Sequence, residues 1–246
     1  MRKFIDNLLI LFSVYVIGPI SAIIFLILAL IGYIKVANIK NLPKLRPKMI
    51  LVANHPDLFD CMYELFLVPT LFLPQAIFHP LKFSTWFLPD KHNFADKWFW
   101  FWWKSRMIPV TRGEGNGSGM GGAREMFRVL DQKSGIVIIF PERGRTNSGK
   151  NFLYSKGGKR IRPISESIGW VALKAQVPVI IPIWLENING VQSPAGKLFS
   201  WPNFKRGQAI VKFGKPIELP DYAKTEDHAR FTEKIAKSLL ELADQE

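Results

Sequence analysis

A long segment without any charge restricts this chain more than any other feature of its sequence. From Leu8 to Ile34 no side chain is charged, and most are large and apolar. A segment of this length is sufficient to cross a lipid bilayer as a helix. Gly18 and Pro19 interrupt its middle, so it predicts either one kinked spanning helix or two short helices that dip into one leaflet. A helix pair buried in a soluble core is the alternative.

Basic residues follow the uncharged segment more densely than they precede it. Arg2 and Lys3 come before it, and five come soon after it: Lys35, Lys40, Lys44, Arg46 and Lys48. If the segment spans the bilayer, this bias places the rest of the chain on the cytoplasmic side, and if it dips, these residues suit anionic headgroups. We therefore expect a membrane anchor over residues 1–40 and a second domain over residues 41–246, localised to the membrane on its cytoplasmic side.

The overall charge narrows the possible partners. The net charge is +13, and the densest basic stretch runs from Arg143 to Arg162. Nucleic acid, anionic membrane and an acidic carrier protein are all attracted by such a charge. No nucleic-acid-binding signature accompanies the stretch, so we expect a membrane or phosphate role and no nucleic-acid partner. The aromatic run Trp98–Trp103 lies between two lysines, which is typical of residues at the headgroup level of a bilayer.

Periodicity predicts an α/β fold. Short apolar runs bounded by turn residues predict strands at 49–53, 71–73, 107–111, 135–140, 177–183 and 208–213. Longer amphipathic segments predict helices at 58–68, 119–132, 165–175 and 225–243. The expected architecture is a mixed, largely parallel sheet flanked by helices, with the N-terminal membrane-associated helical segment attached to it.

A histidine and an aspartate follow the first of these strands. His55 comes two residues after the run 49–53, and Asp60 lies in the first turn of the predicted helix. Across a strand-to-helix turn the two side chains can meet. A carboxylate on one imidazole nitrogen fixes the tautomer and leaves the other nitrogen free to accept a proton. The alternative is that Asp60 or Asp57 caps the helix and His55 fills the turn.

Two further strand ends carry cations. The run 135–140 ends in Pro141–Thr146, which contains Glu142, Gly144 and Arg145, and the run 107–111 ends in Arg112. Arginines beside a flexible glycine suit an anionic, oxygen-rich ligand. The three strand ends together offer one base and several cations. Surface charge at loop tips explains each arginine alone, but it explains the whole set less well.

These blocks resemble the glycerolipid acyltransferases, the family that contains the 1-acylglycerol-3-phosphate acyltransferases. Asn54, His55 and Asp60 match the family's N-H-x-x-x-x-D block, and Arg112 matches the arginine that ends its second block. The third block, close to F-P-E-G-T-R-S, is matched at four positions and has Thr146 in place of serine: Phe140, Pro141, Glu142 and Arg145. The apolar strand 177–182 matches the fourth block, and the order and spacing agree over residues 48–185.

The resemblance implies an enzyme that moves a fatty acyl group from a thioester, acyl-CoA or acyl carrier protein, to the free hydroxyl of a lysophospholipid in phospholipid biosynthesis. The expected acceptor is 1-acylglycerol 3-phosphate (lysophosphatidic acid), and phosphatidate would be the product. His55 would be the general base, supported by Asp60. Arg112 and Arg145 would hold the phosphate, Glu142 would position Arg145 or the glycerol, and Gly144 would let the backbone approach the ligand. The thioester is already activated, so we expect no cofactor and no metal.

Four other interpretations remain. In the first, the acceptor is another lysolipid or a glycolipid. In the second, the protein is not an enzyme but a peripheral protein that binds anionic lipid. In the third, the single cysteine, Cys61, acts as a nucleophilic thiol, although lone cysteines are usually small buried hydrophobic residues. The stretch 117–122 fits the dinucleotide fingerprint G-x-G-x-x-G, but it follows its strand too late and leaves His55 unexplained, so we expect a loop there.

Overall fold

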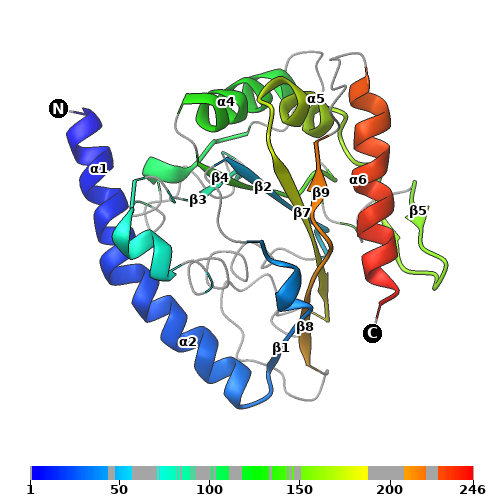
Figure 1. Cartoon of the computed structure of the whole chain (residues 1–246), viewed down its shortest axis with the longest axis horizontal. Helices are drawn as coiled ribbons and strands as arrows, with labels where there is room; N and C mark the ends of the chain where they lie inside the picture. The colour runs from blue at the N-terminus through cyan, green and yellow to red at the C-terminus, as the bar shows by residue number, and fades with distance from the viewer. Residues whose placement is uncertain are drawn as a thin grey trace.

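Helices cover both faces of one large sheet in the computed structural model of the chain (Figure 1). The helices are α1 (Arg2–Phe12), α2 (Gly18–Leu30), α4 (Ser118–Gln132), α5 (Ser167–Lys174) and α6 (His228–Ala243). The strands are β1 (Ile34–Ala37), β2 (Met49–Ala53), β3 (Thr85–Phe87), β4 (Ile136–Ile139), β5 (Leu153–Tyr154), β6 (Arg160–Ile161), β7 (Val179–Glu186), β8 (Ala209–Phe213) and β9 (Ile217–Glu218). The structure describes residues 2–43, 48–56, 71, 73–81, 83, 85–89, 91, 101, 104–110, 118–132, 135–142, 144, 146, 151–187, 208–219 and 227–245.

The sheet is mixed and largely parallel, as predicted. In the described residues its order is β1-β8-β7-β2-β4-β3, and β9 pairs with β7. The pairs β2–β4, β2–β7, β3–β4 and β1–β8 are parallel, whereas β7 runs antiparallel to β8 and β9. Because β2, β4, β3 and β7 run in one direction, their carboxyl ends lie at one edge of the sheet, where ligands bind in open α/β sheets.

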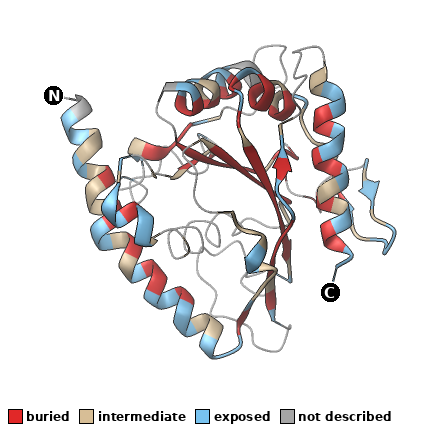
Figure 2. Cartoon of the chain, in the orientation of Figure 1, coloured by how far each residue is buried: buried red, intermediate tan, exposed pale blue. Residues whose placement is uncertain are grey.

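Alternate residues of the central strands pack into two separate cores. On β2, Ile50 and Val52 face the core beneath α4, α5 and α6, while Met49 and Leu51 face the core that includes Phe25 of α2. The whole of β2 is buried, which explains why its sequence is continuously apolar rather than alternating (Figure 2). Both cores therefore hold β2 in place, and the residues that follow β2 begin from a rigid position.

The uncharged N-terminal segment folds as a helical run that passes through a π-helical turn. Residues 13–17 form this turn between α1 and α2, and Pro19 follows it directly. Proline has no N–H and crowds the carbonyl group four residues earlier, and a wider π turn accommodates both. Within the described residues, one helix, Phe4–Leu30, is long and apolar enough to cross a membrane by length and composition.

The N-terminal helical run packs along the side of the body. Tyr15 donates a hydrogen bond from its hydroxyl group to the carbonyl oxygen of Ile77 at 2.8 Å, and a Cβ on Gly18 would lie only 3.1 Å from the Leu73 side chain. Arg106 donates to the Ser13 hydroxyl group within the π turn. Burial without a carboxylate partner among the described residues lowers the pKa of Arg106 to about 10.

Several predicted elements differ from those observed. Residues 71–73 were expected as a strand, but Leu71 and residues 73–78 are helical. An apolar run of three residues shows no period, so it does not distinguish a strand from a helix. In the described part of the segment 107–111, Met107 bridges Phe87, and the N–H groups of Ile108 and Val110 donate to the carbonyl oxygens of Phe87 and Pro89. The segment therefore runs beside β3 as an edge contact. The expected loop at 117–122 is also wrong over residues 118–122, which begin α4.

Strand β1 lies within the stretch 1–40 that the sequence assigned to the anchor, and the sequence did not predict it. Its residues pair in register with β8, from Ile34 with Ala209 to Ala37 with Lys212. Residues 34–37 are therefore part of the sheet, and the division into 1–40 and 41–246 remains a prediction. The predicted helices 119–132, 165–175 and 225–243 agree with α4, α5 and α6 to within a few residues. The predicted helix 58–68 lies outside the described residues.

Candidate active site

His55 emerges from the carboxyl end of β2, between the ends of β4 and β7. Its neighbour Asn54 is buried and binds the backbone of Leu185 on β7 at two points. The Asn54 amide NH₂ donates to the Leu185 carbonyl oxygen at 2.9 Å, and the Leu185 N–H donates to the Asn54 amide oxygen at 2.6 Å. The asparagine side chain thus continues the ladder between β2 and β7 one step beyond its last residue, and it fixes where His55 begins.

The backbone of His55 is held from the other side by the segment that follows β4. Its N–H donates to Glu142 Oε1 at 2.7 Å, and its carbonyl oxygen accepts from the Thr146 N–H at 2.7 Å. The imidazole ring stacks on Phe140, with ring centroids 4.7 Å apart. The hydrogen bonds to Glu142 and Thr146 are made by backbone atoms of His55, so they position the residue through its main chain. The half-buried imidazole is therefore suited to exchange a proton with a bound substrate.

Glu142 is the centre of this arrangement. Its side chain is 1% exposed and accepts hydrogen bonds from the His55 N–H, the Arg162 N–H and the Thr146 hydroxyl group. Burial raises the pKa of the Glu142 carboxyl group, and the hydrogen bonds from Arg162, His55 and Thr146 act in the opposite direction. Both carboxylate oxygens are occupied by donors of the protein itself. This geometry favours a positioning role for Glu142, whereas its predicted contact with Arg145 or the glycerol remains untested.

Gly144 makes room for a side chain of the protein. An ideal Cβ atom at this position would overlap Nη1 of Arg162 and would lie 3.4 Å from its Cζ atom. The sequence predicted that Gly144 lets the backbone approach a ligand, and that prediction remains open. Arg162 was visible in the sequence only as one member of a basic stretch, so no sequence signal separated it from its neighbours.

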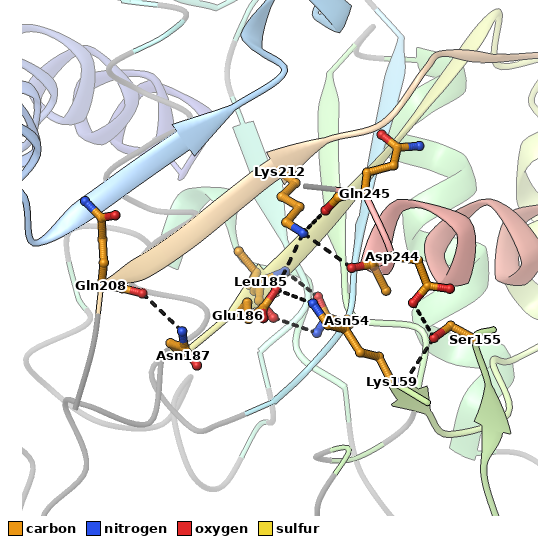
Figure 3. A network of polar contacts seen from close by, with 11 residues as sticks. Asn54, Ser155, Lys159, Leu185, Glu186, Asn187, Gln208, Lys212, Asp244 and Gln245 are labelled. Carbon is orange, nitrogen blue, oxygen red and sulfur yellow. Dashed lines mark hydrogen bonds and ion pairs between the residues drawn. The ribbon is translucent and has the colours of Figure 1, made fainter. Parts of the chain in front are cut away.

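A second polar network fastens the elements around β7 (Figure 3). Lys159, between β5 and β6, forms a salt bridge with Glu186 at 2.7 Å, next to the Leu185 backbone that holds Asn54. Asp244, just after α6, accepts from the Ser155 hydroxyl group at 2.7 Å and from the Gly157 N–H at 2.9 Å. These hydrogen bonds lower the pKa of Asp244. The β5–β6 hairpin is thereby attached both to the sheet and to α6.

The remaining predicted site residues lie outside the described part of the chain. These are Asp60, Arg112 and Arg145, together with Cys61 and all of the aromatic run 98–103 except Phe101. The structure thus brings His55, Glu142 and Gly144 into one group, and the roles assigned to all six residues remain predictions. Among the described residues, no three His, Cys, Asp or Glu side chains gather as a metal site would require, and the expectation that no metal is needed remains a prediction.

A histidine held at the carboxyl edge of an α/β sheet, beside a segment whose sequence is rich in cations, is an arrangement suited to acyl transfer onto a hydroxyl group. Comparison with known families supports the same class, because residues 33–186 match the Acyltransferase family, and the match covers more than half of the chain. The protein therefore belongs to the Acyltransferase family.

Among solved structures, the chain is similar to the 1-acyl-sn-glycerophosphate (LPA) acyltransferase PlsC from Thermotoga maritima. The two share 19% sequence identity with a TM-score of 0.56, over 100% of this chain and 99% of the other. At this identity the likeness shows the fold. No curated protein matches the sequence.

Proposed function

We propose that the protein transfers a fatty acyl group from a thioester to the free hydroxyl of a lysophospholipid, with 1-acylglycerol 3-phosphate as acceptor and phosphatidate as product. His55 takes the proton of the acceptor hydroxyl while that oxygen attacks the thioester carbonyl carbon. The new ester bond forms, the C–S bond breaks, and the departing thiolate receives the proton from His55. Asp60 would support the imidazolium that forms in between.

The observation that carries this proposal is the backbone clamp on His55. Hydrogen bonds from both backbone groups of His55 to the segment 142–146 hold the imidazole at the end of β2, and general-base catalysis requires such a fixed position. Family membership supports acyl transfer, and the similarity to the Thermotoga enzyme supports lysophosphatidate as the acceptor. The net charge of +13 suits both anionic lipid and the phosphates of a thioester donor.

Thiol release measured on the purified protein in mixed micelles tests the proposal. Acyl-CoA and acyl carrier protein should be compared as donors, against lysophosphatidate, other lysophospholipids and a glycolipid as acceptors. We expect release only when an acceptor is present, with lysophosphatidate as the preferred acceptor. Preference for another acceptor would replace the headgroup assignment. Lipid binding without any release would favour the non-catalytic lipid-binding alternative.

Removing the predicted phosphate ligands should weaken the use of a phosphate-bearing acceptor. We expect Arg112→Ala and Arg145→Ala each to raise the apparent barrier by about 1.5–3 kcal/mol, the value of a charge-assisted contact. The loss should be much smaller with monoacylglycerol, which lacks the phosphate. Measurement of kcat/KM for both acceptors decides the point. An equal loss on both would assign the arginines to the donor or to the fold.

We also propose that the N-terminal helical run binds one face of a membrane rather than crossing it. Its exposed side chains form a large apolar surface that includes Ile20, Ile23, Ile27 and Leu30. Its opposite side packs on the body: Phe25 joins a sheet core, and Ser13 accepts from Arg106. A perpendicular crossing would draw Arg106 and the Tyr15–Ile77 contact towards the hydrocarbon centre. The cytoplasmic position of the catalytic domain remains a prediction from the flanking lysines.

Substitutions on the exposed face test this attachment. Replacing Ile20, Ile23 and Ile27 together with glutamine should weaken binding to anionic vesicles about 100-fold, since each half-exposed side chain contributes on the order of 1 kcal/mol. The residual binding should fall as salt increases, because lysines then provide most of it. Vesicle co-sedimentation measures both effects. The double variant Leu153→Gln/Tyr154→Gln on the exposed strand β5 is the control, and equal losses in the two variants would contradict the proposed surface.

A further inference from the structure

The backbone of Arg162 is fixed to the same carboxylate as the backbone of His55. The Arg162 N–H donates to Glu142 Oε2 at 2.8 Å, and the His55 N–H donates to Oε1 of the same group at 2.7 Å. Three residues later, the Ser165 N–H donates to the Pro141 carbonyl oxygen at 2.9 Å. Ile161, on the other side, is completely buried. The position of Arg162 is therefore set by the candidate active site itself.

The side chain of Arg162 extends over Gly144. A Cβ at Gly144 would overlap its Nη1 atom, so the absence of a side chain there lets the guanidinium group approach the backbone of the segment that follows β4. In sequence, Gly144 stands between Arg143 and Arg145. The guanidinium group of Arg162 thus lies against Gly144, the residue that precedes the predicted phosphate ligand Arg145 in the sequence.

The charge of Arg162 has no counter-charge in the described part of the chain. No carboxylate there forms a salt bridge with it, and the oxygens of Glu142 already accept from three donors. Two other arginines do have partners: Arg128 forms a salt bridge with Glu125, and Arg160 lies over the Phe152 ring at 4.2 Å. A half-buried guanidinium group presents a planar set of donors that matches a phosphate group.

We infer that Arg162 binds a phosphate group of a substrate, beside Gly144 and at the same end of the sheet as His55. The inference rests on the proposed function, which supplies two sources of phosphate: the acceptor headgroup and the phosphates of the thioester donor. In both cases Arg162 adds a ligand that is not part of the four motif blocks and is carried by the chain between β6 and α5.

Kinetics of Arg162→Ala separate the two sources. KM is measured for lysophosphatidate and monoacylglycerol as acceptors, and for acyl-CoA and acyl-pantetheine as donors. In Arg162→Ala we expect KM to rise about 10- to 100-fold only for the substrate whose phosphate Arg162 binds. A rise confined to lysophosphatidate assigns Arg162 to the acceptor, and a rise confined to acyl-CoA assigns it to the donor. Equal changes for all four substrates would overturn the inference. Arg160→Ala, two residues away and exposed, is the matched control and should change none of them.

Gly144→Ala gives a second measurement. Its Cβ should displace the guanidinium group, so in the wild-type background it should raise KM for the same substrate as Arg162→Ala does. In the Arg162→Ala background it should add little. If the glycine acts only by letting a ligand approach its backbone, the two effects should add fully, which would count against the inference.

Binding of glycerol 3-phosphate and of CoA to the purified full chain supplies a readout that does not depend on turnover. We expect Arg162→Ala, but not Arg160→Ala, to weaken binding of one of these probes about 10- to 100-fold, with an unchanged thermal unfolding midpoint. If the wild type binds a probe in this manner but transfers no acyl group, the proposed function fails and the phosphate site stands. If Arg162→Ala binds both probes as the wild type does, the inference is overturned, whatever the transfer assay shows.

Discussion

Replacing His55 with alanine should remove nearly all acyl transfer while leaving the fold intact. General-base catalysis contributes about 10²–10⁴-fold to rate, and the alignment of the attacking oxygen is lost as well. The fold should survive because the bonds from His55 to Glu142 and Thr146 use its backbone, which alanine retains. The His55 side chain stacks on Phe140, and alanine gives up this contact. Single-turnover rates together with thermal unfolding of the same preparations check both halves of this expectation.

Two companion variants sharpen the result for His55. Asp60→Asn should also be severe, because an amide favours the wrong imidazole tautomer. His228→Ala, on α6 and 3.5 Å from Glu166, removes a histidine that does not belong to the candidate site and should leave transfer unchanged. A well-folded His55→Ala protein with near wild-type turnover would contradict the mechanism.

Replacing Glu142 with alanine should lower both stability and rate. The change leaves the N–H groups of His55 and Arg162 without their acceptor, and each buried unsatisfied donor costs about 1–3 kcal/mol, so we expect a loss of about 2–6 kcal/mol. Glu142→Gln should lose less, because one oxygen remains as an acceptor. Chemical denaturation gives the free energy of unfolding for each variant.

The kinetics of Glu142→Gln distinguish its two possible roles. If Glu142 positions His55, kcat should fall while KM for the acceptor changes little. If it contacts the acceptor directly, as the sequence suggested, KM should rise. Glu125→Gln, at a half-buried position of α4, is the control for the loss of one carboxylate and should affect neither quantity.

The sequence predicted which strand ends carry the candidate site, because short apolar runs followed by polar residues are a local signal. His55, Glu142 and Gly144 indeed lie together at the ends of β2 and β4. The direction of the Glu142 side chain was not predictable, since the donors that turn it inward come from His55 and Arg162, which are distant in sequence. The two-point contact of Asn54 with Leu185 is likewise a long-range pairing that no local pattern reveals.

Strand β1 shows the same limit for the fold. Ile34–Ala37 contains one lysine and follows directly on the uncharged segment, so it reads as the flank of a membrane helix. Only the parallel register with β8 makes it a strand. Conversely, the apolar run 71–73 had the composition of a strand, but Leu71 and Leu73 are helical, and Leu73 lies close to Gly18. Short elements of this kind are determined by their neighbours rather than by their own residues.

The pairing of β1 with β8 has a consequence for the order of folding during synthesis. The ribosome makes residues 34–37 early, but their partner, residues 209–213, is made only after the central strands β2, β4 and β7. Until then the edge of β1 is open and the apolar side chains of α2 have no core to cover. Exposed apolar surface on a partly synthesised chain promotes aggregation. A nearby lipid surface covers these side chains until the sheet is complete. We therefore expect translation in the presence of vesicles to raise the yield of folded protein more than vesicles added after release from the ribosome.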